Sequence, residues 1–165
     1  EYTDKVGDGA GVFKSTDRGN NWTQINNGLD SLETNILTVD PNDSETLYLG
    51  TDDDGVYKSK DGGESWNKLT VSSLSKSFGV GDIIVDPQNS NNIYIGTVDY
   101  FRLSESRGVL GDFGVYKSTD GGATWEEFNA GLNHLGVFSL ELSEENRILY
   151  AGTRAGGVYW ISLDN

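Results

Sequence analysis

Short apolar segments recur along the chain in a fixed order. Each unit begins with two nearly continuous apolar runs, such as ILTVD at 36–40 and TLYLG at 46–50, which are typical of strands covered on both faces. A third segment, GVYKS at 55–59, alternates around an aromatic residue, and a fourth begins at a tryptophan, as in WNKL at 66–69. The pattern predicts antiparallel units of four short strands, called A to D here in chain order.

An octapeptide of the form SxDxGxxW marks the junction of the C and D strands in three units. Its fixed positions are Ser15, Asp17, Gly19 and Trp22, then Ser59, Asp61, Gly63 and Trp66, and finally Ser118, Asp120, Gly122 and Trp125. A further C-type segment, GVYWIS at 157–162, begins in the same way and then loses the octapeptide. The unit that carries the third octapeptide contains an insertion within residues 97–114.

Four-stranded units repeated at this spacing are typical of β-propeller blades. We therefore predict an all-β fold of about three and a half blades, one partial propeller over residues 1–165. The blade parts are expected at residues 1–25, 36–69, 82–128 and 137–163. Because known propellers close with four or more blades, we expect an incomplete ring, which other blades of a longer protein or further copies would complete. The chain also contains no methionine, which fits a processed or excised sequence.

The chemistry of the octapeptide predicts a structural turn. Serine and aspartate side chains hydrogen-bond neighbouring backbone groups in tight turns, and glycine adopts positive φ without steric cost. The tryptophan is expected to bury its indole in the sheet core. None of these residues is arranged for catalysis.

These residues resemble the Asp-box, or bacterial neuraminidase repeat, of a known group of propellers. That group includes sialidases, sortilin-type receptors, two-domain xyloglucanases and a photosystem II assembly factor, and the resemblance covers nearly the whole chain. It implies a propeller fold, an extracellular or cell-surface location, and ligand binding on the face opposite the boxes. The box is specific for the fold and does not identify an activity.

Propeller geometry separates the loops into two faces. The boxes share one face with the A–B turns, and the B–C and D–A loops share the other. On this second face the sequence places aromatic, basic and acidic residues that suit stacking on sugars or gripping a peptide. The candidate ligand-binding residues are Asp99, Tyr100, Phe101, Arg102, Arg107, Asp112, Phe113, His134 and Arg154. Alternatively, the aromatic residues of the insertion cover the outer edge of the blade, and the histidine is a local hydrogen-bonding residue.

Three consecutive carboxylates, Asp52, Asp53 and Asp54, occupy a B–C hairpin. They are candidate calcium ligands, although the spacing lacks the alternating ligands of a calcium loop, so a solvated hairpin is the alternative. Asp52 also matches the place where xyloglucanase-like enzymes carry a catalytic aspartate. Other units have Asp8 and Arg154 at that place, so the match also fits ordinary hairpin chemistry. Apart from calcium, no cofactor is expected.

The net charge of −14 argues against partners that carry phosphate. Nucleic-acid binding requires clustered Lys and Arg, and anionic membrane surfaces repel an acidic protein. No apolar stretch is long enough to span a bilayer, so membrane insertion is not expected. With no cysteine and one histidine, thiolate chemistry is excluded and a zinc site is not expected.

The sequence favours a non-catalytic segment of a secreted or surface protein that binds carbohydrate or a protein partner. The alternative is that the chain forms part of a glycoside hydrolase propeller. In that case the sequence favours a xyloglucanase-like enzyme over a sialidase-like one. Sialidase-like sites hold a substrate carboxylate with three arginines, but Arg18 and Arg147 are expected on the box face. A third hypothesis is an intracellular assembly factor, which would need a protein partner on the same face.

Overall fold

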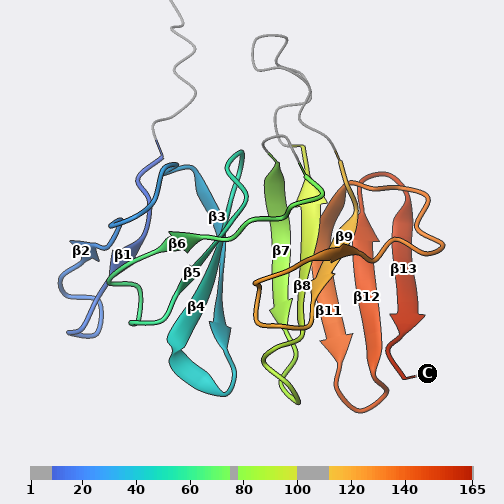
Figure 1. Ribbon diagram of the computed structural model, residues 1–165. Helices are drawn as coiled ribbons and strands as arrows, with labels where there is room; N and C mark the ends of the chain where they lie inside the picture. Colours follow the sequence, from blue (N-terminus) through green and yellow to red (C-terminus); the bar gives the residue numbers. More distant parts are fainter. Residues whose placement is uncertain (1–8, 75–77, 100–111, 165) are drawn as a thin grey trace, which may run out of the picture.

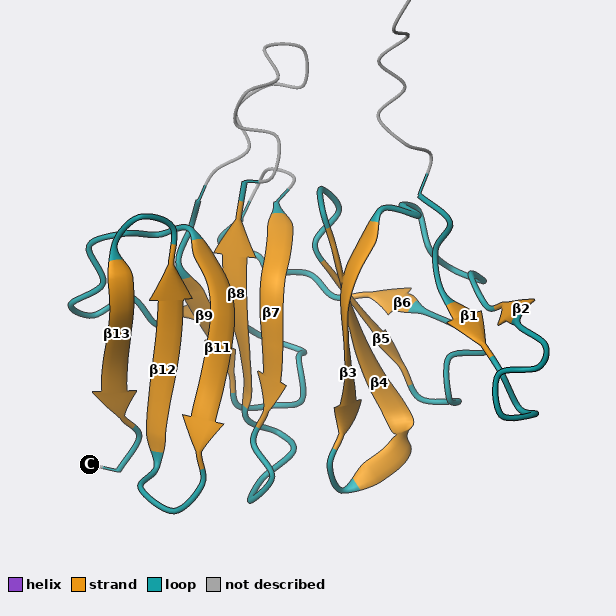
Figure 2. Cartoon of the chain, turned by 180° about the vertical axis from the view of Figure 1, so that it is seen from behind, coloured by secondary structure: helices purple, strands orange, loops and turns teal. Residues whose placement is uncertain are grey.

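The chain folds into antiparallel β-sheets arranged side by side in chain order. The computed structural model describes residues 9–74, 78–99 and 112–164, and within them it contains thirteen strands in four sheets and no helix. The all-β prediction of partial propeller blades is confirmed (Figures 1 and 2). Because these residues contain no helix, none of them provides a helix able to cross a membrane.

The four sheets repeat the predicted strand order. The first contains β1 (Phe13–Lys14) and β2 (Thr23–Gln24); the second contains β3 (Thr34–Asp40), β4 (Asp43–Thr51), β5 (Val56–Ser59) and β6 (Asn67–Lys68). The third contains β7 (Gly79–Val85), β8 (Ile93–Val98), β9 (Val115–Ser118) and β10 (Glu126–Glu127), and the fourth contains β11 (Val137–Ser143), β12 (Ile148–Thr153) and β13 (Gly157–Ser162). They correspond to C-D, A-B-C-D, A-B-C-D and A-B-C.

Neighbouring sheets are joined along their A strands, β3, β7 and β11. Asn35 Nδ2 donates to the carbonyl of Val80 at 2.9 Å, and Thr38 Oγ1 donates to that of Ile83, also at 2.9 Å. On the next pair, the Asp82 carboxylate accepts from the Leu140 N–H at 2.8 Å. Since each bond joins a side chain to the backbone of the adjacent sheet, the A strands fix the order and spacing of the blades.

The expectation that A strands are covered on both faces is wrong for β3. Leu37 and Val39 are about half exposed, and burial alternates along this strand. By contrast, every residue of the B strand β8 is buried. The reason is position: a B strand lies between its sheet partners and two neighbouring sheets, whereas A strands border the inner side of the blade array.

The hydrophobic core lies between the sheets rather than within any one of them. One cluster joins Trp66, Leu47 and Tyr57 of the second sheet to Ile25 from the first. A second joins Val56 of the second sheet to the third sheet, and a third cluster joins the third sheet to the fourth. Because many apolar side chains of one blade are covered by an adjacent blade, each blade depends on its neighbours for burial.

The prediction that every box tryptophan is buried is wrong for Trp22. Trp66 and Trp125 expose 3% and 7% of their surface, whereas Trp22 exposes 62%. Trp66 lies against the preceding sheet, where its indole Nε1 donates to the carbonyl of Ile25 at 2.8 Å. Among the described residues no sheet precedes the first one, so nothing covers Trp22.

The fourth sheet lacks a box, as the sequence indicated. The B–C register pairs Leu47 with Ser59 in the second sheet, but it pairs Leu149 with Ile161 in the fourth. Ile161 therefore occupies the place of the box serine. Instead of turning, β13 continues to Ser162 as a six-residue strand.

Candidate functional site

The boxes and the A–B turns lie on one face, as predicted. The Gly62 N–H in the second box donates to the carbonyl of Glu45 in the adjacent A–B turn at 2.9 Å. In the third sheet Gly121 makes the equivalent bond to Asn91 at 3.0 Å. We call this side the box face, and it lies at the end where the β3–β4, β7–β8 and β11–β12 turns are drawn in Figure 1.

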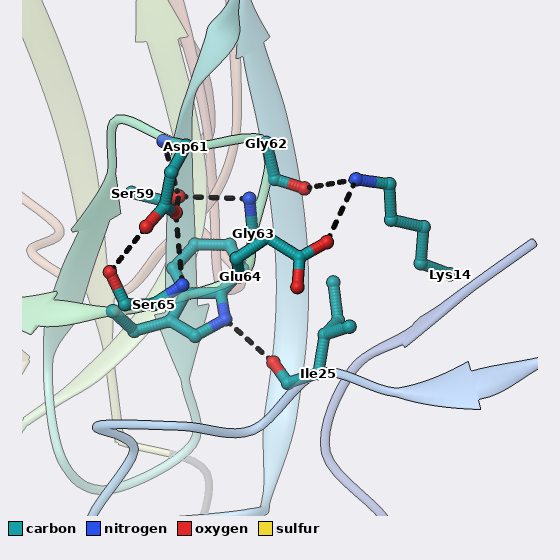
Figure 3. Close-up of polar contacts among 9 residues, drawn as sticks. Lys14, Ile25, Ser59, Asp61, Gly62, Gly63, Glu64 and Ser65 are labelled. Carbon is teal, nitrogen blue, oxygen red and sulfur yellow. Dashed lines mark hydrogen bonds and ion pairs between the residues drawn. The ribbon is translucent and has the colours of Figure 1, made fainter.

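Each box is held by the same hydrogen bonds around its serine and aspartate. In the second box Ser59 Oγ donates to Asp61 at 2.7 Å and accepts from the Gly63 N–H at 2.9 Å (Figure 3). Asp61 also accepts from the backbone and the hydroxyl of Ser65, at 2.9 and 2.5 Å. These donors stabilise the charged carboxylate and lower the pKa of Asp61 to about 2. The third box repeats this pattern, and the pKa of Asp120 is also lowered to about 2.

The oxygens of the box carboxylates therefore accept hydrogen bonds from groups within their own turns. Ser118 Oγ donates to Asp120 and Ser15 Oγ donates to Asp17, at 2.8 and 2.9 Å. Hydrogen bonds from Asn21 and Ser15 lower the pKa of Asp17 as well. An acid with a low pKa and satisfied oxygens cannot serve as a general acid near neutral pH. The geometry supports the structural interpretation of the box.

The B–C and D–A loops meet on the opposite side, which we call the loop face. The Asp52 N–H donates to the carbonyl of Glu33 at 2.9 Å, and the Gly114 N–H donates to that of Leu135 at 2.9 Å. In the fourth sheet the Arg154 N–H donates to the carbonyl of Gly136 at 2.8 Å. The B–C loops of the second and fourth sheets are thus tied to the D–A loop that precedes their own sheet, and the B–C loop of the third sheet is tied to the D–A loop that follows it. These bonds fix the relative positions of the candidate residues.

The three consecutive aspartates have separate partners. Asp53 accepts from Ser31 Oγ at 3.0 Å, while Asp54 accepts from the hydroxyl of Tyr57 and pairs with Lys68 at 2.5 Å. Asp52 makes no comparable side-chain bond, and its pKa is raised by partial burial and by the nearby carboxylates of Glu33 and Asp53. The three side chains are directed to different partners instead of converging on one point.

Within the part of the chain that the structure describes, no group of three or more His, Cys, Asp or Glu residues could hold a metal ion. Calcium binding by Asp52, Asp53 and Asp54 therefore stays a sequence prediction.

A second set of candidates meets around the base of the insertion. The Asp99 N–H donates to Asp112 at 2.8 Å, and Arg154 Nη2 donates to the carbonyl of Asp99 at 2.8 Å. The Arg154 guanidinium also lies over the ring of Phe138, 5.0 Å from its centroid. Asp99, Asp112 and Arg154 were predicted from the sequence, and the structure brings them together. Tyr100, Phe101, Arg102 and Arg107 lie outside the described residues.

Two predicted site residues have local roles in the structure. Phe113 packs against the core cluster between the second and third sheets. His134 Nδ1 lies 3.1 Å from the hydroxyl of Tyr159, and the equivalent Tyr57 hydroxyl accepts from the Asp30 N–H at 3.2 Å. The histidine contact therefore repeats a link between the C strand and the preceding D–A loop. Ligand binding by either residue stays a prediction.

Sequence reasoning missed Phe138 and Glu33 as members of the loop face. Phe138 lies at the bulge that separates Val137 from Ser139 in the β11–β12 register, and it is 39% exposed. Bulges often redirect a side chain next to a functional site. A signal was available for Glu33, because it lies in a D–A loop, and these loops were assigned to this face from the sequence. No such signal existed for Phe138, because the bulge in β11 is visible only in the strand register.

Known proteins similar to this chain include a xyloglucanase and two GH74 enzymes. The chain is 36% identical over 96 residues to xyloglucanase Xgh74A of Acetivibrio thermocellus, a match that covers 53% of this chain and 11% of the relative. The fold is similar to that of an ancestral GH74 enzyme, with a TM-score of 0.72 and 25% identity over 93% of this chain and 20% of that one. It is also similar to the GH74 enzyme of Niastella koreensis, with a TM-score of 0.65 and 27% identity over 92% of this chain and 24% of that one.

The chain thus spans about a tenth of the curated relative and about a fifth to a quarter of the solved structures. The model of the family described as sortilin, neurotensin receptor 3, matches residues 10–159. Together with the repeated four-stranded blades, this match shows that the chain belongs to the Sortilin-Vps10 family of propellers.

Proposed function

We propose that this chain is a polysaccharide-binding part of an extracellular GH74-type propeller, with the ligand held on the loop face. The observation that carries the proposal is the cluster of Asp99, Asp112, Arg154 and Phe138 at the base of the insertion. Carboxylates and a guanidinium supply hydrogen bonds to sugar hydroxyls, and an exposed aromatic ring supplies a stacking surface. On the box face, by contrast, the carboxylates of Asp61 and Asp120 are hydrogen-bonded within their own turns.

The similarity to a xyloglucanase suggests the class of ligand. Xyloglucan is a β-glucan with neutral sugar side chains, so binding needs no cationic patch and is compatible with a net charge of −14. We expect neutral β-glucan oligosaccharides to bind more tightly than anionic ones, because acidic sugars would meet Asp99 and Asp112. The extracellular location is part of the same proposal, because plant polysaccharides are encountered outside the cell.

Calorimetric titration of the chain with xyloglucan oligosaccharides tests this proposal, with mannan oligosaccharides as the comparison ligand. Phe138→Ala should weaken xyloglucan binding about tenfold, since an aromatic contact contributes on the order of 1 kcal/mol. Trp22→Ala removes an exposed aromatic residue of the box-bearing first sheet and is the matched control. Equal loss in both variants, or no binding to any β-glucan by the folded chain, would contradict the proposal.

A second candidate function is catalysis, and the raised pKa of Asp52 favours it. A glycoside hydrolase needs a protonated carboxyl to donate to the leaving oxygen and a second carboxyl about 5–10 Å away. Asp52 has the required direction of pKa shift and lies on the loop face. The second carboxyl is not assigned within this chain, so catalysis by Asp52 is proposed only for the propeller as a whole.

The test is sugar release from xyloglucan by the longest protein that contains this chain. Asp52→Asn should lower the rate at least a hundredfold, as expected for loss of a general acid. Asp53→Asn is the control, because it makes the same change at the neighbouring carboxylate, which accepts from Ser31 Oγ. If Asp52→Asn left the rate unchanged, the carboxyl would have no catalytic role.

A further inference from the structure

A polar groove lies on the box face between the second and third sheets, both of which have all four strands within the described residues. Its volume of about 720 Å³ is within the range of about 300–1,000 Å³ that is typical of ligand sites. The lining includes two lysines, Lys58 and Lys60, the amide side chains of Asn67 and Asn91, and residues 120–123 of the third box. The groove is thus bounded by two complete blades.

The equivalent space between the first and second boxes, called the first gap here, is filled by the chain itself. Lys14 Nζ donates to the carbonyl of Gly62 at 3.0 Å and pairs with Glu64 Oε1 at 3.5 Å (Figure 3). Glu45 approaches the same place, because its Oε2 and Lys14 Nζ lie 2.8 and 3.3 Å from the point at which a Cβ on Gly62 would stand. In the first gap, therefore, one lysine faces two glutamates of the next sheet.

The groove between the second and third boxes keeps the lysine but lacks both glutamates. Lys58 Nζ donates to the carbonyl of Gly121 at 2.9 Å, which repeats the lysine contact of the first gap. Ala123 occupies the box position that holds a glutamate in the first gap. Asn91 occupies the corresponding A–B turn position, and its Oδ1 lies 3.5 Å from the point at which a Cβ on Gly121 would stand. The replacement of both glutamates by neutral residues leaves space beside Lys58.

Lys60 adds a second positive charge, at the position where the first box has Thr16. Burial, and then the nearby ammonium of Lys60, lowers the pKa of Lys58. Asp61 and Asp120 also line the groove, but their oxygens accept hydrogen bonds within their own turns. In the described part of the chain neither Lys58 nor Lys60 forms an ion pair with a carboxylate. Two neighbouring ammonium groups therefore face the groove without a counter-ion from the chain.

We propose that this groove binds an acidic peptide segment, in which two carboxylate side chains take the places that glutamates occupy in the first gap. The carboxylates pair with Lys58 and Lys60, and the amides of Asn67 and Asn91 hydrogen-bond the peptide backbone.

A peptide is favoured over a polysaccharide because none of the described residues that line the groove is aromatic, so no ring is available to stack on a sugar. The net charge of −14 opposes the approach of an acidic ligand, but charges more than about 8 Å away are largely screened at physiological ionic strength. The two lysines therefore dominate the local interaction. This site lies on the box face and is separate from the glycan site on the loop face.

The test measures binding of a fluorescently labelled hexaglutamate peptide to the full chain by fluorescence anisotropy, with hexaglutamine as the uncharged comparison. Hexaglutamate should bind and hexaglutamine should not. Lys60→Gln should weaken binding about threefold to fivefold, as expected for loss of one exposed charge contact. Ala123→Glu should weaken it about tenfold, because it restores a carboxylate of the first gap beside Lys58.

Lys68→Gln is the matched control and should leave the affinity unchanged. It removes the same charge from the same sheet, but the Lys68 ammonium lies over the ring of Tyr57 and pairs with Asp54, away from the groove. Lys60, Lys68 and Ala123 are all exposed, so the three variants should fold.

Amide NMR spectra of the unchanged chain locate the binding. Hexaglutamate should shift the signals of residues 58–67 and 120–123 while leaving those of the loop face in place. Absence of binding, shifts confined to other residues, or an equal loss of affinity in Lys60→Gln and Lys68→Gln would overturn the proposal. So would equally tight binding of hexagalacturonate, which carries its carboxylates on sugar rings, or displacement of the peptide by an equal concentration of inorganic phosphate, because the groove would then select a polysaccharide or a simple anion.

Discussion

The first and second boxes have the same pattern of residues but different surroundings. Ser15 and Ser59 both bond to their aspartates, and both boxes contain a glycine at positive φ. Yet Trp22 is 62% exposed and Trp66 is 3% exposed. The turn is therefore a local structure that the octapeptide forms by itself, whereas burial of the indole needs the preceding sheet. Substitutions in the two boxes test this difference.

The largest effect is expected from removal of the buried indole. Trp66→Ala should destabilise the chain by about 3–5 kcal/mol, because it leaves a cavity between two sheets and removes the bond to Ile25. Trp22→Ala should cost about 0.5 kcal/mol, as for a surface substitution. Urea unfolding of both variants, with the slope checked for two-state behaviour, measures the difference. An equal loss of unfolding free energy in the two variants would show that the Trp22 indole is buried in solution.

A smaller difference is expected between the box serines. Ser59 is fully buried, and its hydroxyl bonds to Asp61 and Gly63. Ser59→Ala should cost about 1–3 kcal/mol, because a buried N–H loses its acceptor. Ser15→Ala should cost about 1 kcal/mol or less, since water can replace the hydroxyl at the more exposed turn. Thermal unfolding of the two alanine variants gives the comparison, and a larger cost at Ser15 would contradict it.

The first box also carries backbone strain that the others avoid. Arg18 has a φ of 62°, at the position occupied by Gly62 and Gly121 with φ values of 65° and 75°. Arg18→Gly should therefore stabilise the chain by about 0.5–1 kcal/mol, since glycine adopts this conformation without a steric penalty. Gly121→Ala is the reciprocal variant and should destabilise by a similar amount. Both shifts are measurable in denaturant midpoints, and a destabilised Arg18→Gly protein would argue against strain.

Asp61 on the box face and Asp52 on the loop face should contribute to folding stability with opposite dependences on pH. The pKa of Asp61 is lowered to about 2, so its contribution to stability is present above about pH 4 and is lost as the pH falls toward 2. The pKa of Asp52 is raised, so its contribution is present below about pH 4 and is lost as the pH rises through its folded value.

At pH 7, therefore, Asp61→Asn should lower the melting temperature and Asp52→Asn should raise it. The Asp52→Asn effect should vanish below about pH 4, where both forms are neutral. Melting curves between pH 2 and 8 provide the check. A fall in melting temperature at pH 7 for Asp52→Asn would show that the charged form of Asp52 is stabilised rather than strained.

Much of the fold could be predicted because it depends on local sequence patterns that repeat along the chain. The apolar runs, the three boxes and the isoleucine that stands in place of the box serine in β13 are all visible in the sequence, and the strand order follows from their order. The separation of the two faces also follows, because strand alternation fixes which loops share an end. The loop-face cluster could be predicted only in part: Asp99, Asp112 and Arg154 were found from their loops, whereas Phe138 depends on a bulge.

The sequence alone determined the four-stranded repeat, the turns and the side of the molecule on which the B–C and D–A loops lie, since these depend on residues close in the chain. The tertiary structure decided which indoles are covered and that Asp52 is partly buried beside Glu33. The physical reason is that burial and charge interactions arise between sheets, where contacting residues are separated by about one repeat or more and no local pattern reports whether a neighbour is present.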